Sequence, residues 1–282
     1  MKTLHIDTGR EMRGGQWQAL YLVERLEDAK LLTPLGSRLL DEARRHGLDV
    51  WPLSYIMMAR VARSSAVVHA HDAHAHSLAA FFGGAPLVVS RRVAFPVKRD
   101  FASKWKYAKP ARFIAVSKFA AGRLGEAGIP REKIRVVYDG VPVPENPSTR
   151  QPGRVVALAS KSVDIPGIEV QSISDLWQDL SAASVFVYAS EMEGLGSAAL
   201  AAMACGVPVV ASRAGGLPEI VEHERTGLLV DGGDFRGAVQ RLLENPAEAA
   251  AMGDRGREMV RQNFSVGAMV NATRKVYEEV LG

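Results

Sequence analysis

The sequence predicts a doubly wound α/β fold arranged in two domains, and three observations lead to this prediction. Short apolar runs alternate with helix-like stretches along the whole chain. The chain has 282 residues, which is enough for two α/β domains of ordinary size. A proline-rich segment interrupts the alternation near the middle of the chain. A hydrophobic fraction of 47% and a charged fraction of 23% are typical of a globular protein with a sizeable core.

The first half of the chain contains six apolar runs of strand length. Helix-like stretches such as Trp17–Leu26 and Leu39–His46 lie between them. Apolar strands separated by helices indicate a parallel sheet that is covered on both faces. The predicted strands are Leu4–Asp7, Ala29–Thr33, Ala66–Ala70, Leu87–Ser90, Phe113–Val116 and Ile134–Tyr138.

The segment Val141–Gly153 has four prolines in thirteen residues, and prolines cannot donate the hydrogen bonds of a sheet. We therefore expect an N-terminal domain over residues 1–141, a linker over 142–153 and a C-terminal domain over 154–264. Residues 265–282 carry apolar side chains on one helical face, which predicts a C-terminal helix. Strands of the second domain are predicted at Val155–Ser160, Val185–Tyr188, Val207–Ala211 and Gly227–Val230.

Charge and cysteine content limit the class of protein only loosely. The formal net charge is +4, too small an excess to select one anionic partner. The single cysteine, Cys205, excludes an intrachain disulfide. No apolar run approaches the roughly 18 residues that cross a bilayer, so we expect a cytoplasmic protein that could contact the inner face of a membrane.

The stretch after the predicted strand Val185–Tyr188 has the pattern of a phosphate and sugar site. A loop containing Glu193, Gly194 and Gly196 leads into the Ala-rich helix Ser197–Ala204. The free N–H groups at a helix start favour an anion, and glycine lets the backbone approach a phosphate closely. Glu193 is placed to accept hydrogen bonds from sugar hydroxyls.

Four blocks in this half resemble the retaining glycosyltransferases of family 4, which have the GT-B fold. Ser190–Gly196 reads S-E-M-E-G-L-G, Ala204–Ser212 reads A-C-G-V-P-V-V-A-S, Gly215–Val221 reads G-G-L-P-E-I-V and Thr226–Val230 reads T-G-L-L-V. The first half resembles the same family in its glycine turn, its H-x-H strand end, its I-A-V-S segment and a later strand end. These segments are Arg13–Gly15, Val68–His71, Ile114–Ser117 and Val136–Val141.

This resemblance implies two Rossmann-like domains facing across a cleft, with the C-terminal helix returning to the first domain. It implies transfer from a nucleotide-sugar to a glycan or glycolipid acceptor, with no cofactor and no bound metal. Glu193 and His71 would be catalytic. The donor would be bound by Gly14, Gly15, Gly194, Leu195, Gly196 and Ser197.

Two departures from the family pattern bear on activity. The second glutamate of the family's pair is replaced by Ala201, which removes an acceptor for the ribose, a loss of about 1–3 kcal/mol at a buried site. Arg154–Ser160 aligns with a later family strand, which implies a shortened second domain without the family's Arg and Lys for the diphosphate. We expect Arg10 or Arg13 to replace them, because an Arg fork binds phosphate oxygens in pairs. The alternative is a catalytically impaired GT-B-like subunit that binds a nucleotide or glycan.

Two further clusters allow more than one interpretation. His69, His71, His74 and His76 could hold a metal, although only Asp72 offers a carboxylate beside them, or they could be polar residues that end a strand without chemistry. The segment from Arg91 to Arg112 carries eight basic residues with aromatic residues between them. This pattern fits a solvated face, or an anionic membrane or phosphorylated lipid acceptor, with Arg91, Arg92 and Lys98 binding the acceptor. The sequence has no recognisable nucleic-acid-binding motif.

Overall fold

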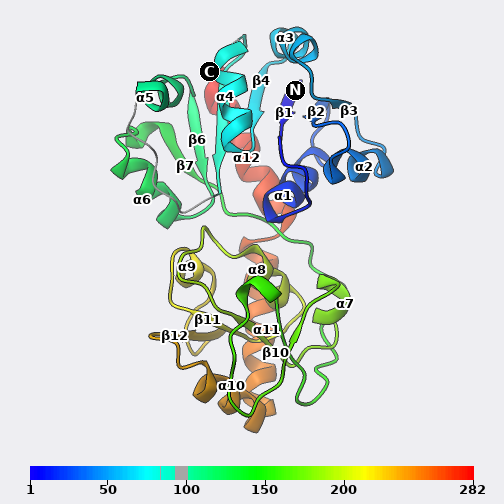
Figure 1. The fold of residues 1–282 in the computed structure, drawn as a ribbon, viewed down its shortest axis with the longest axis vertical. Coiled ribbons are helices and arrows are strands. Elements are labelled where there is room, and N and C mark those ends of the chain that lie inside the picture. The colour runs from blue at the N-terminus through cyan, green and yellow to red at the C-terminus, as the bar shows by residue number, and fades with distance from the viewer. Residues whose placement is uncertain (83, 93–100) are drawn as a thin grey trace. The chain divides into compact units, whose positions relative to one another are not determined.

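The computed structural model describes residues 1–82, 84–92 and 101–282, and the chain folds into two compact α/β units (Figure 1). Unit 1 comprises Met1–Asp139 and Met269–Gly282, and unit 2 comprises Gly140–Ala268. Residues 142–153, expected as a linker, lie within unit 2. Their backbone bonds to this unit, because the Ser148 N–H donates to the Cys205 carbonyl at 2.6 Å and the Thr149 N–H donates to the Ser181 carbonyl at 2.8 Å.

Unit 1 contains a seven-stranded parallel sheet in the order β3-β2-β1-β4-β5-β6-β7. The central strand β1 is buried along its whole length, as expected for a strand covered on both faces. The strands are β1 (Thr3–Ile6), β2 (Ala29–Thr33), β3 (Val50–Pro52), β4 (Val67–Ala70), β5 (Leu87–Arg91), β6 (Arg112–Ala115) and β7 (Ile134–Val136).

Helices cover both faces of this sheet. Several begin at serine caps, where the side chain of Ser37, Ser54 or Ser117 accepts a backbone N–H of the first turn. The C-terminal helix contributes Tyr277, which is fully buried, and Glu279, which pairs with Arg112 and Arg135. The helices of unit 1 are α1 (Gly14–Val23), α2 (Arg38–Arg45), α3 (Tyr55–Ser64), α4 (Ala73–Phe82), α5 (Phe101–Ala108), α6 (Lys118–Glu126) and, from Met269, α12 (Val266–Leu281).

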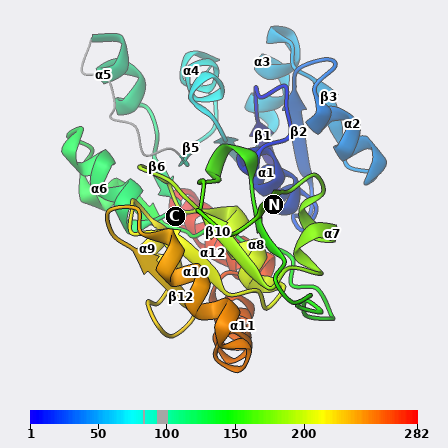
Figure 2. The same ribbon diagram turned by 60° about the horizontal axis from the view of Figure 1, so that its bottom comes forward.

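Unit 2 contains a five-stranded parallel sheet in the order β12-β11-β10-β8-β9. Figure 2 shows its longer helices, α10 and α11, packed beside the sheet. The strands are β8 (Val155–Ala157), β9 (Val170–Ser172), β10 (Val185–Tyr188), β11 (Val209–Ser212) and β12 (Gly227–Val230). The helices are α7 (Leu176–Leu180), α8 (Ser197–Ala204), α9 (Leu217–Ile220), α10 (Phe235–Glu244) and α11 (Pro246–Asn263).

The strand after the proline-rich segment is the first strand of the second sheet. This strand, β8, pairs with β9 on one side and with β10 on the other. Its alignment with a later strand of the family stays a prediction. The short strands β3 and β9 were not predicted, since neither contains a run of buried apolar residues. The strand β11 begins at Val209 rather than Val207, as Pro208 has no N–H to donate.

Each sheet has a switch point, where the chain connections of two neighbouring strands run to opposite sides of the sheet. These switch points locate the candidate sites. The connections leave β1 and β4 in opposite directions, and the same holds for β8 and β10. Ligands of open α/β sheets bind at the carboxyl ends of such strands. The loops that follow β1, β4, β8 and β10 therefore carry the candidate functional residues.

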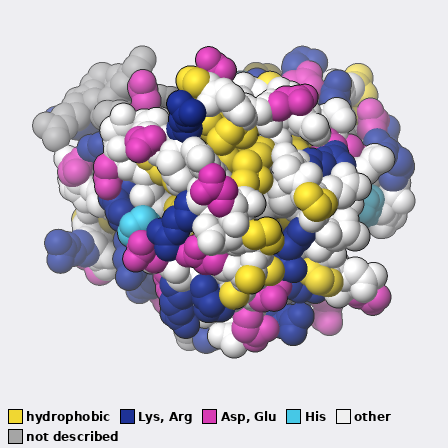
Figure 3. All heavy atoms as spheres, turned by 90° about the horizontal axis from the view of Figure 1, so that it is seen from below, with side chains coloured by type: hydrophobic (Ala, Val, Ile, Leu, Met, Phe, Trp, Pro, Cys, Tyr) yellow, Lys and Arg dark blue, Asp and Glu magenta, His cyan; other side chains and the backbone are white. Residues whose placement is uncertain are grey.

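The surface charge and the apolar length of the helices do not select one kind of partner. Figure 3 shows acidic and basic side chains interspersed over the face seen from below, in keeping with the small net charge. No helix within the described ranges is both long and apolar enough to span a bilayer.

The contact between α8 and α11 gives a test of the packing in unit 2. A Cβ added at Gly253 would lie 2.0 Å from the Gly206 carbonyl oxygen, so Gly253→Ala must push the two segments apart. We expect this overpacking to lower the free energy of unfolding by about 1–3 kcal/mol in urea denaturation. Gly122→Ala in α6 is the control, because its Cβ meets open space, and it should stabilise the protein by about 0.5–1 kcal/mol. Equal effects of the two changes would contradict this packing.

Candidate active site

The loop between β10 and α8 in unit 2 is built around a left-handed glycine. Gly196 caps α8 with φ of 103°, a conformation that favours glycine. A Cβ at this position would also lie 2.7 Å from the Leu217 side chain. The helix therefore begins directly beside the loop, and its first N–H groups lack intrahelical partners, as at every helix start. Leu195 is buried, so its side chain is not open to a ligand, whereas Ser197 is half-buried.

A second glycine pair, Gly215 and Gly216, packs against the backbone of this loop. A Cβ at Gly215 would lie 2.0 Å from the Glu193 carbonyl oxygen, and one at Gly216 would lie 2.3 Å from the Gly194 carbonyl oxygen. The Gly216 N–H also donates to the Glu193 carbonyl at 3.0 Å. Two motifs that are separate in the sequence therefore form one backbone-to-backbone contact.

Glu193 is held by three groups of its own unit. The Tyr188 hydroxyl donates to Oε2 at 2.8 Å, and the Gly194 N–H donates to Oε1 at 3.1 Å. Lys161 Nζ lies 3.2 Å from Oε2. Burial, together with the charge of Glu193, raises the pKa of the Tyr188 phenol, so the phenol remains a donor.

Lys161 is the cation that the structure places in this cluster. It follows β8, donates to the Ser190 hydroxyl at 2.8 Å and lies 5.6 Å from the centre of the Tyr188 ring. The switch between β8 and β10 thus combines an ammonium group, a carboxylate and a helix start. Such a set can bind a phosphate through Lys161 and the helix, and sugar hydroxyls through Glu193. Arg213, the other basic residue that follows a strand here, pairs with Asp231 at 3.0 Å on the surface.

In unit 1, the loops after β1 and β4 are tied together. The Thr8 hydroxyl donates to Asp72 at 2.7 Å, and Asp72 also accepts the backbone N–H groups of His74 and Ala75 at the start of α4. Asp7 is fully buried and accepts from the Gln16 amide at 2.9 Å. Burial is the main cause that raises the pKa of the Asp7 carboxyl. None of Asp7, Thr8 and Gln16 was identified from the sequence, because isolated polar residues at strand ends give no motif.

The residues expected as a glycine turn instead begin a helix. Gly14 and Gly15 form the first turn of α1, and Arg13 is its N-cap residue. The Arg13 N–H donates to the Gln16 side-chain oxygen at 3.3 Å. The side chains of Arg10 and Arg13 are on the surface of unit 1, and their role towards a diphosphate stays a prediction.

A second group of polar side chains meets at the carboxyl ends of the unit 1 strands: Arg92, His71 and Asp139. Arg92 Nη1 lies 3.3 Å from His71 Nδ1, and Arg92 Nε lies 3.4 Å from Asp139 Oδ1. Its side chain is 13% exposed and passes Gly15, where a Cβ would lie 3.6 Å from Arg92 Cδ. Arg91, at the end of β5, contributes to lowering the pKa values of His76 and Lys106, so the two arginines act on different groups. Lys98, the third basic residue expected to bind the acceptor, lies outside the described residues.

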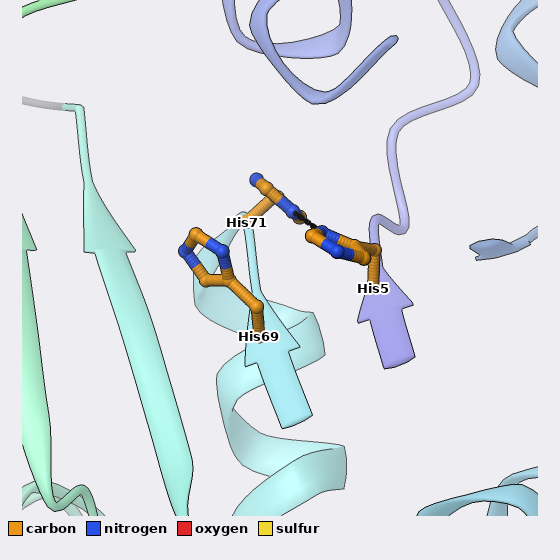
Figure 4. A group of neighbouring side chains, drawn as sticks. All are labelled: His5, His69 and His71. Carbon is orange, nitrogen blue, oxygen red and sulfur yellow. Dashed lines mark hydrogen bonds between the residues drawn. The ribbon is translucent and has the colours of Figure 1, made fainter. Parts of the chain in front are cut away.

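The predicted histidine cluster regroups in the structure. His74 is exposed on α4, and His76 lies 3.1 Å from the Lys106 carbonyl oxygen. His5, which sequence reasoning missed, instead joins His69 and His71 (Figure 4). Candidate ligand atoms of these three rings lie within 4.8 Å of one another, a spacing open to a metal ion. The register of the parallel strands β1 and β4, in which His5 pairs with His69, is the feature that brings these rings together.

Each buried ring is kept neutral mainly by burial. Burial, with the charge of Arg92, lowers the pKa of His5 to about 3, and the pKa values of His69 and His71 are also well below 6.5. Neutral imidazole can bind a metal or form hydrogen bonds with both nitrogens. All six ring nitrogens have hydrogen-bond partners inside unit 1, at distances from 2.6 to 3.3 Å.

Comparison with known proteins identifies the class of both units. The family model described as "Glycosyltransferase Family 4" matches residues 14–144, and the model "Glycosyl transferases group 1" matches residues 168–259. The chain is 36% identical over 105 residues to N-acetyl-alpha-D-glucosaminyl L-malate synthase of Bacillus anthracis, covering 36% of this chain and 28% of that protein. It is 51% identical over 77 residues to a GDP-mannose-dependent phosphatidylinositol monomannoside mannosyltransferase of Mycolicibacterium smegmatis, covering 26% of this chain and 20% of that protein.

Solved structures match over nearly the whole chain. Anabaena Alr3699/HepE in complex with UDP superposes with a TM-score of 0.87 at 16% identity, covering 99% of this chain and 100% of that one. The lipopolysaccharide outer core galactosyltransferase WaaB matches with a TM-score of 0.73 at 14% identity, covering 99% and 100%. The fold is thus that of GT-B proteins, and the predicted fold class is confirmed. Each unit thus matches a family model of glycosyltransferases, and the chain has the fold of the GT-B class.

The buried histidines predict a pH dependence of stability. An unfolded histidine takes up a proton below pH 6.5, whereas His76, with a folded pKa of about 3, does not, so stability falls as pH falls. His76→Gln can still donate to the Lys106 carbonyl. Its loss of stability between pH 7.5 and 5.5 should be smaller than that of the wild type by about 1.4 kcal/mol in urea denaturation. The control His74→Gln changes an exposed histidine of the same helix and should leave the dependence unchanged.

Proposed function

We propose that this protein is a retaining glycosyltransferase that moves a sugar from a nucleotide-diphosphate sugar to an envelope glycolipid or polysaccharide. The observation that carries the proposal is the cluster of Lys161, Glu193 and the start of α8 at the switch point of unit 2. Support comes from Anabaena Alr3699/HepE, which was solved with UDP and with UDP-glucose. The retaining outcome follows from the resemblance to family 4.

In this proposal the donor half of the reaction takes place at unit 2. Lys161 and the N–H groups at the start of α8 bind the diphosphate and stabilise the charge that develops on it as the sugar leaves. Glu193 exchanges its contact with Lys161 for the hydroxyls of the donor sugar. Tyr188 and the Gly194 N–H keep the carboxylate in place during this exchange. In this proposal Lys161, rather than Arg10 or Arg13, supplies the positive charge for the diphosphate.

The acceptor half is proposed at unit 1. Arg92 meets an anionic group of the acceptor, and the glycine start of α1 lies against its stem. No bound metal takes part in the proposed reaction, so chelators should not change its rate.

One observation favours the second candidate, a GT-B-like subunit that binds a nucleotide or glycan without turnover. Ala201 is 1% exposed on α8, so this position offers no carboxylate to a ribose. A nucleotide that binds and no donor that turns over would select this function.

A panel of nucleotide sugars tests the donor site. We expect one donor to bind the wild type in calorimetry and to be slowly hydrolysed. Lys161→Met should weaken this binding at least tenfold, because a hydrogen bond to a charged group contributes about 1.5–3 kcal/mol. Glu193→Gln keeps the size of the side chain, and it should lower hydrolysis more than binding.

The control for this panel is Arg261→Ala, which removes a surface cation from α11 in the same unit. It should leave binding and hydrolysis at wild-type values. Equal binding by Lys161→Met and the wild type would place the diphosphate elsewhere and contradict the proposed site.

We also propose that α3, α4 and α5 of unit 1 contact an anionic membrane that carries the acceptor. Phe101 and Trp105 on α5 are 87% and 42% exposed, and Phe81 on α4 is 75% exposed. Trp105, Phe81 and Lys109 line a cavity of about 300 Å³ that these helices form with strands β1, β4 and β5. Exposed aromatic side chains beside lysines suit the interface of an anionic bilayer.

Vesicle sedimentation tests this contact. The double variant Phe101→Ser, Trp105→Ser should lose most binding to vesicles that contain phosphatidylglycerol, whereas neither protein should bind pure phosphatidylcholine. Trp51→Ser, which changes an exposed tryptophan on β3, is the matched control and should bind as the wild type does. Unchanged binding by the double variant would show that these helices do not contact the membrane.

A further inference from the structure

A continuous hydrogen-bonded chain runs through the buried interior of unit 1. Thr3 Oγ1 lies 3.1 Å from His5 Nε2, and His5 Nδ1 lies 3.0 Å from His71 Nε2. His71 Nδ1 lies 3.3 Å from Arg92 Nη1. Figure 4 shows the His5 and His71 rings turned toward each other from neighbouring strand ends. Both rings are at most 4% exposed, so water does not replace these partners.

Arg92, at one end, fixes which atom donates in every hydrogen bond of this series. A guanidinium has donors only, so His71 Nδ1 must accept and therefore carries no proton. A neutral His71 then carries its proton on Nε2 and donates to His5 Nδ1. His5 in turn carries its proton on Nε2 and donates to Thr3 Oγ1. A protonated ring at either position would set two donors against each other.

We propose that His5 is a positioning residue for Arg92. By accepting from His71 Nε2, it holds the His71 ring in the tautomer whose Nδ1 accepts from Arg92. Asp139 and the His71 carbonyl oxygen, 3.3 Å from Arg92 Nη1, hold the same guanidinium from two further directions.

This arrangement leaves one nitrogen of Arg92 for a ligand. Among the residues that the structure describes, no acceptor bonds to Arg92 Nη2. A fork fixed on its other nitrogens presents this donor to an anion with little loss of side-chain entropy. The ligand class is an oxyanion such as the phosphate of an acceptor, and this part rests on the proposed function. The positioning of Arg92 by His5 does not depend on that function.

His69 lies beside the hydrogen-bonded chain of Thr3, His5, His71 and Arg92 but is not part of it. Its nitrogens lie 2.6 Å from the Tyr277 hydroxyl and 2.8 Å from the Ser90 hydroxyl. A hydroxyl can donate or accept, so the tautomer of His69 is not fixed by its partners. His69 therefore provides an internal control for the histidines of the chain.

Two amide substitutions at position 5 separate the role of the His71 contact from general packing. The side-chain oxygen of Asn can take the place of Nδ1 and accept from His71. The longer side chain of Gln places its amide near Nε2, which keeps the contact with Thr3 and loses the one with His71. Both variants are polar and uncharged, and His5→Asn serves as the matched control for His5→Gln.

Imidazole nitrogen NMR at neutral pH reads the tautomers directly. We expect the Nε2–H tautomer for His5 and His71 in the wild type, and for His71 in His5→Asn. In His5→Gln the His71 signals should show a mixture of tautomers. The Nδ1–H tautomer of His71 in the wild type would overturn the proposal, as would one unchanged tautomer in both variants. One equivalent of Zn²⁺ that binds and shifts the signals of all three rings would also overturn it, in favour of a metal triad.

Titration with inorganic phosphate tests the ligand end. His5→Gln should weaken phosphate binding about tenfold, as should Arg92→Lys, while His5→Asn should bind as the wild type does. Equal binding by His5→Gln and the wild type would overturn the link to Arg92. A wild type that binds no phosphate, with the tautomers as expected, would overturn the oxyanion site on unit 1 and leave the positioning of Arg92 intact.

Discussion

The site in unit 2 depends on a contact between two backbones that only glycine allows. The chain at Gly215 and Gly216 lies so close to Glu193 and Gly194 that a Cβ at either glycine would overlap a carbonyl oxygen. This contact fixes the loop before α8 and with it the position of the Glu193 carboxylate. The left-handed Gly196 then turns the chain into the helix. The glycines of these motifs therefore allow two backbone segments to lie in contact, and the position of the Glu193 side chain depends on that contact.

The parallel topology supplies the remaining groups. Strands β8 and β10 are neighbours and end at the same edge of the sheet, so Lys161 and Glu193 meet although 31 residues lie between them in the sequence. The same rule joins the loops after β1 and β4 through Thr8 and Asp72. Each unit thus carries polar groups at its switch point: Lys161 and Glu193 beside a helix start in unit 2, and a buried, neutral histidine cluster in unit 1.

The histidine cluster shows how burial shapes the chemistry of unit 1. His5, His69 and His71 lie among Arg92, Tyr277 and other polar partners, and burial keeps the rings uncharged. Because His71 uses both nitrogens inside the protein, the group of this cluster best placed to meet a ligand is Arg92 rather than His71 itself. The C-terminal helix completes the cluster, since the Tyr277 hydroxyl contacts His69.

The sequence by itself determined the fold class, several strands to the residue, and the loop with Glu193. Ala29–Thr33, Val185–Tyr188 and Gly227–Val230 were predicted with the bounds that the structure has, because their apolar runs are short and clearly bounded. Only the tertiary structure decided which distant side chains meet. Lys161 beside Glu193, and His5 beside His71, follow from strand order and register, which local periodicity does not encode.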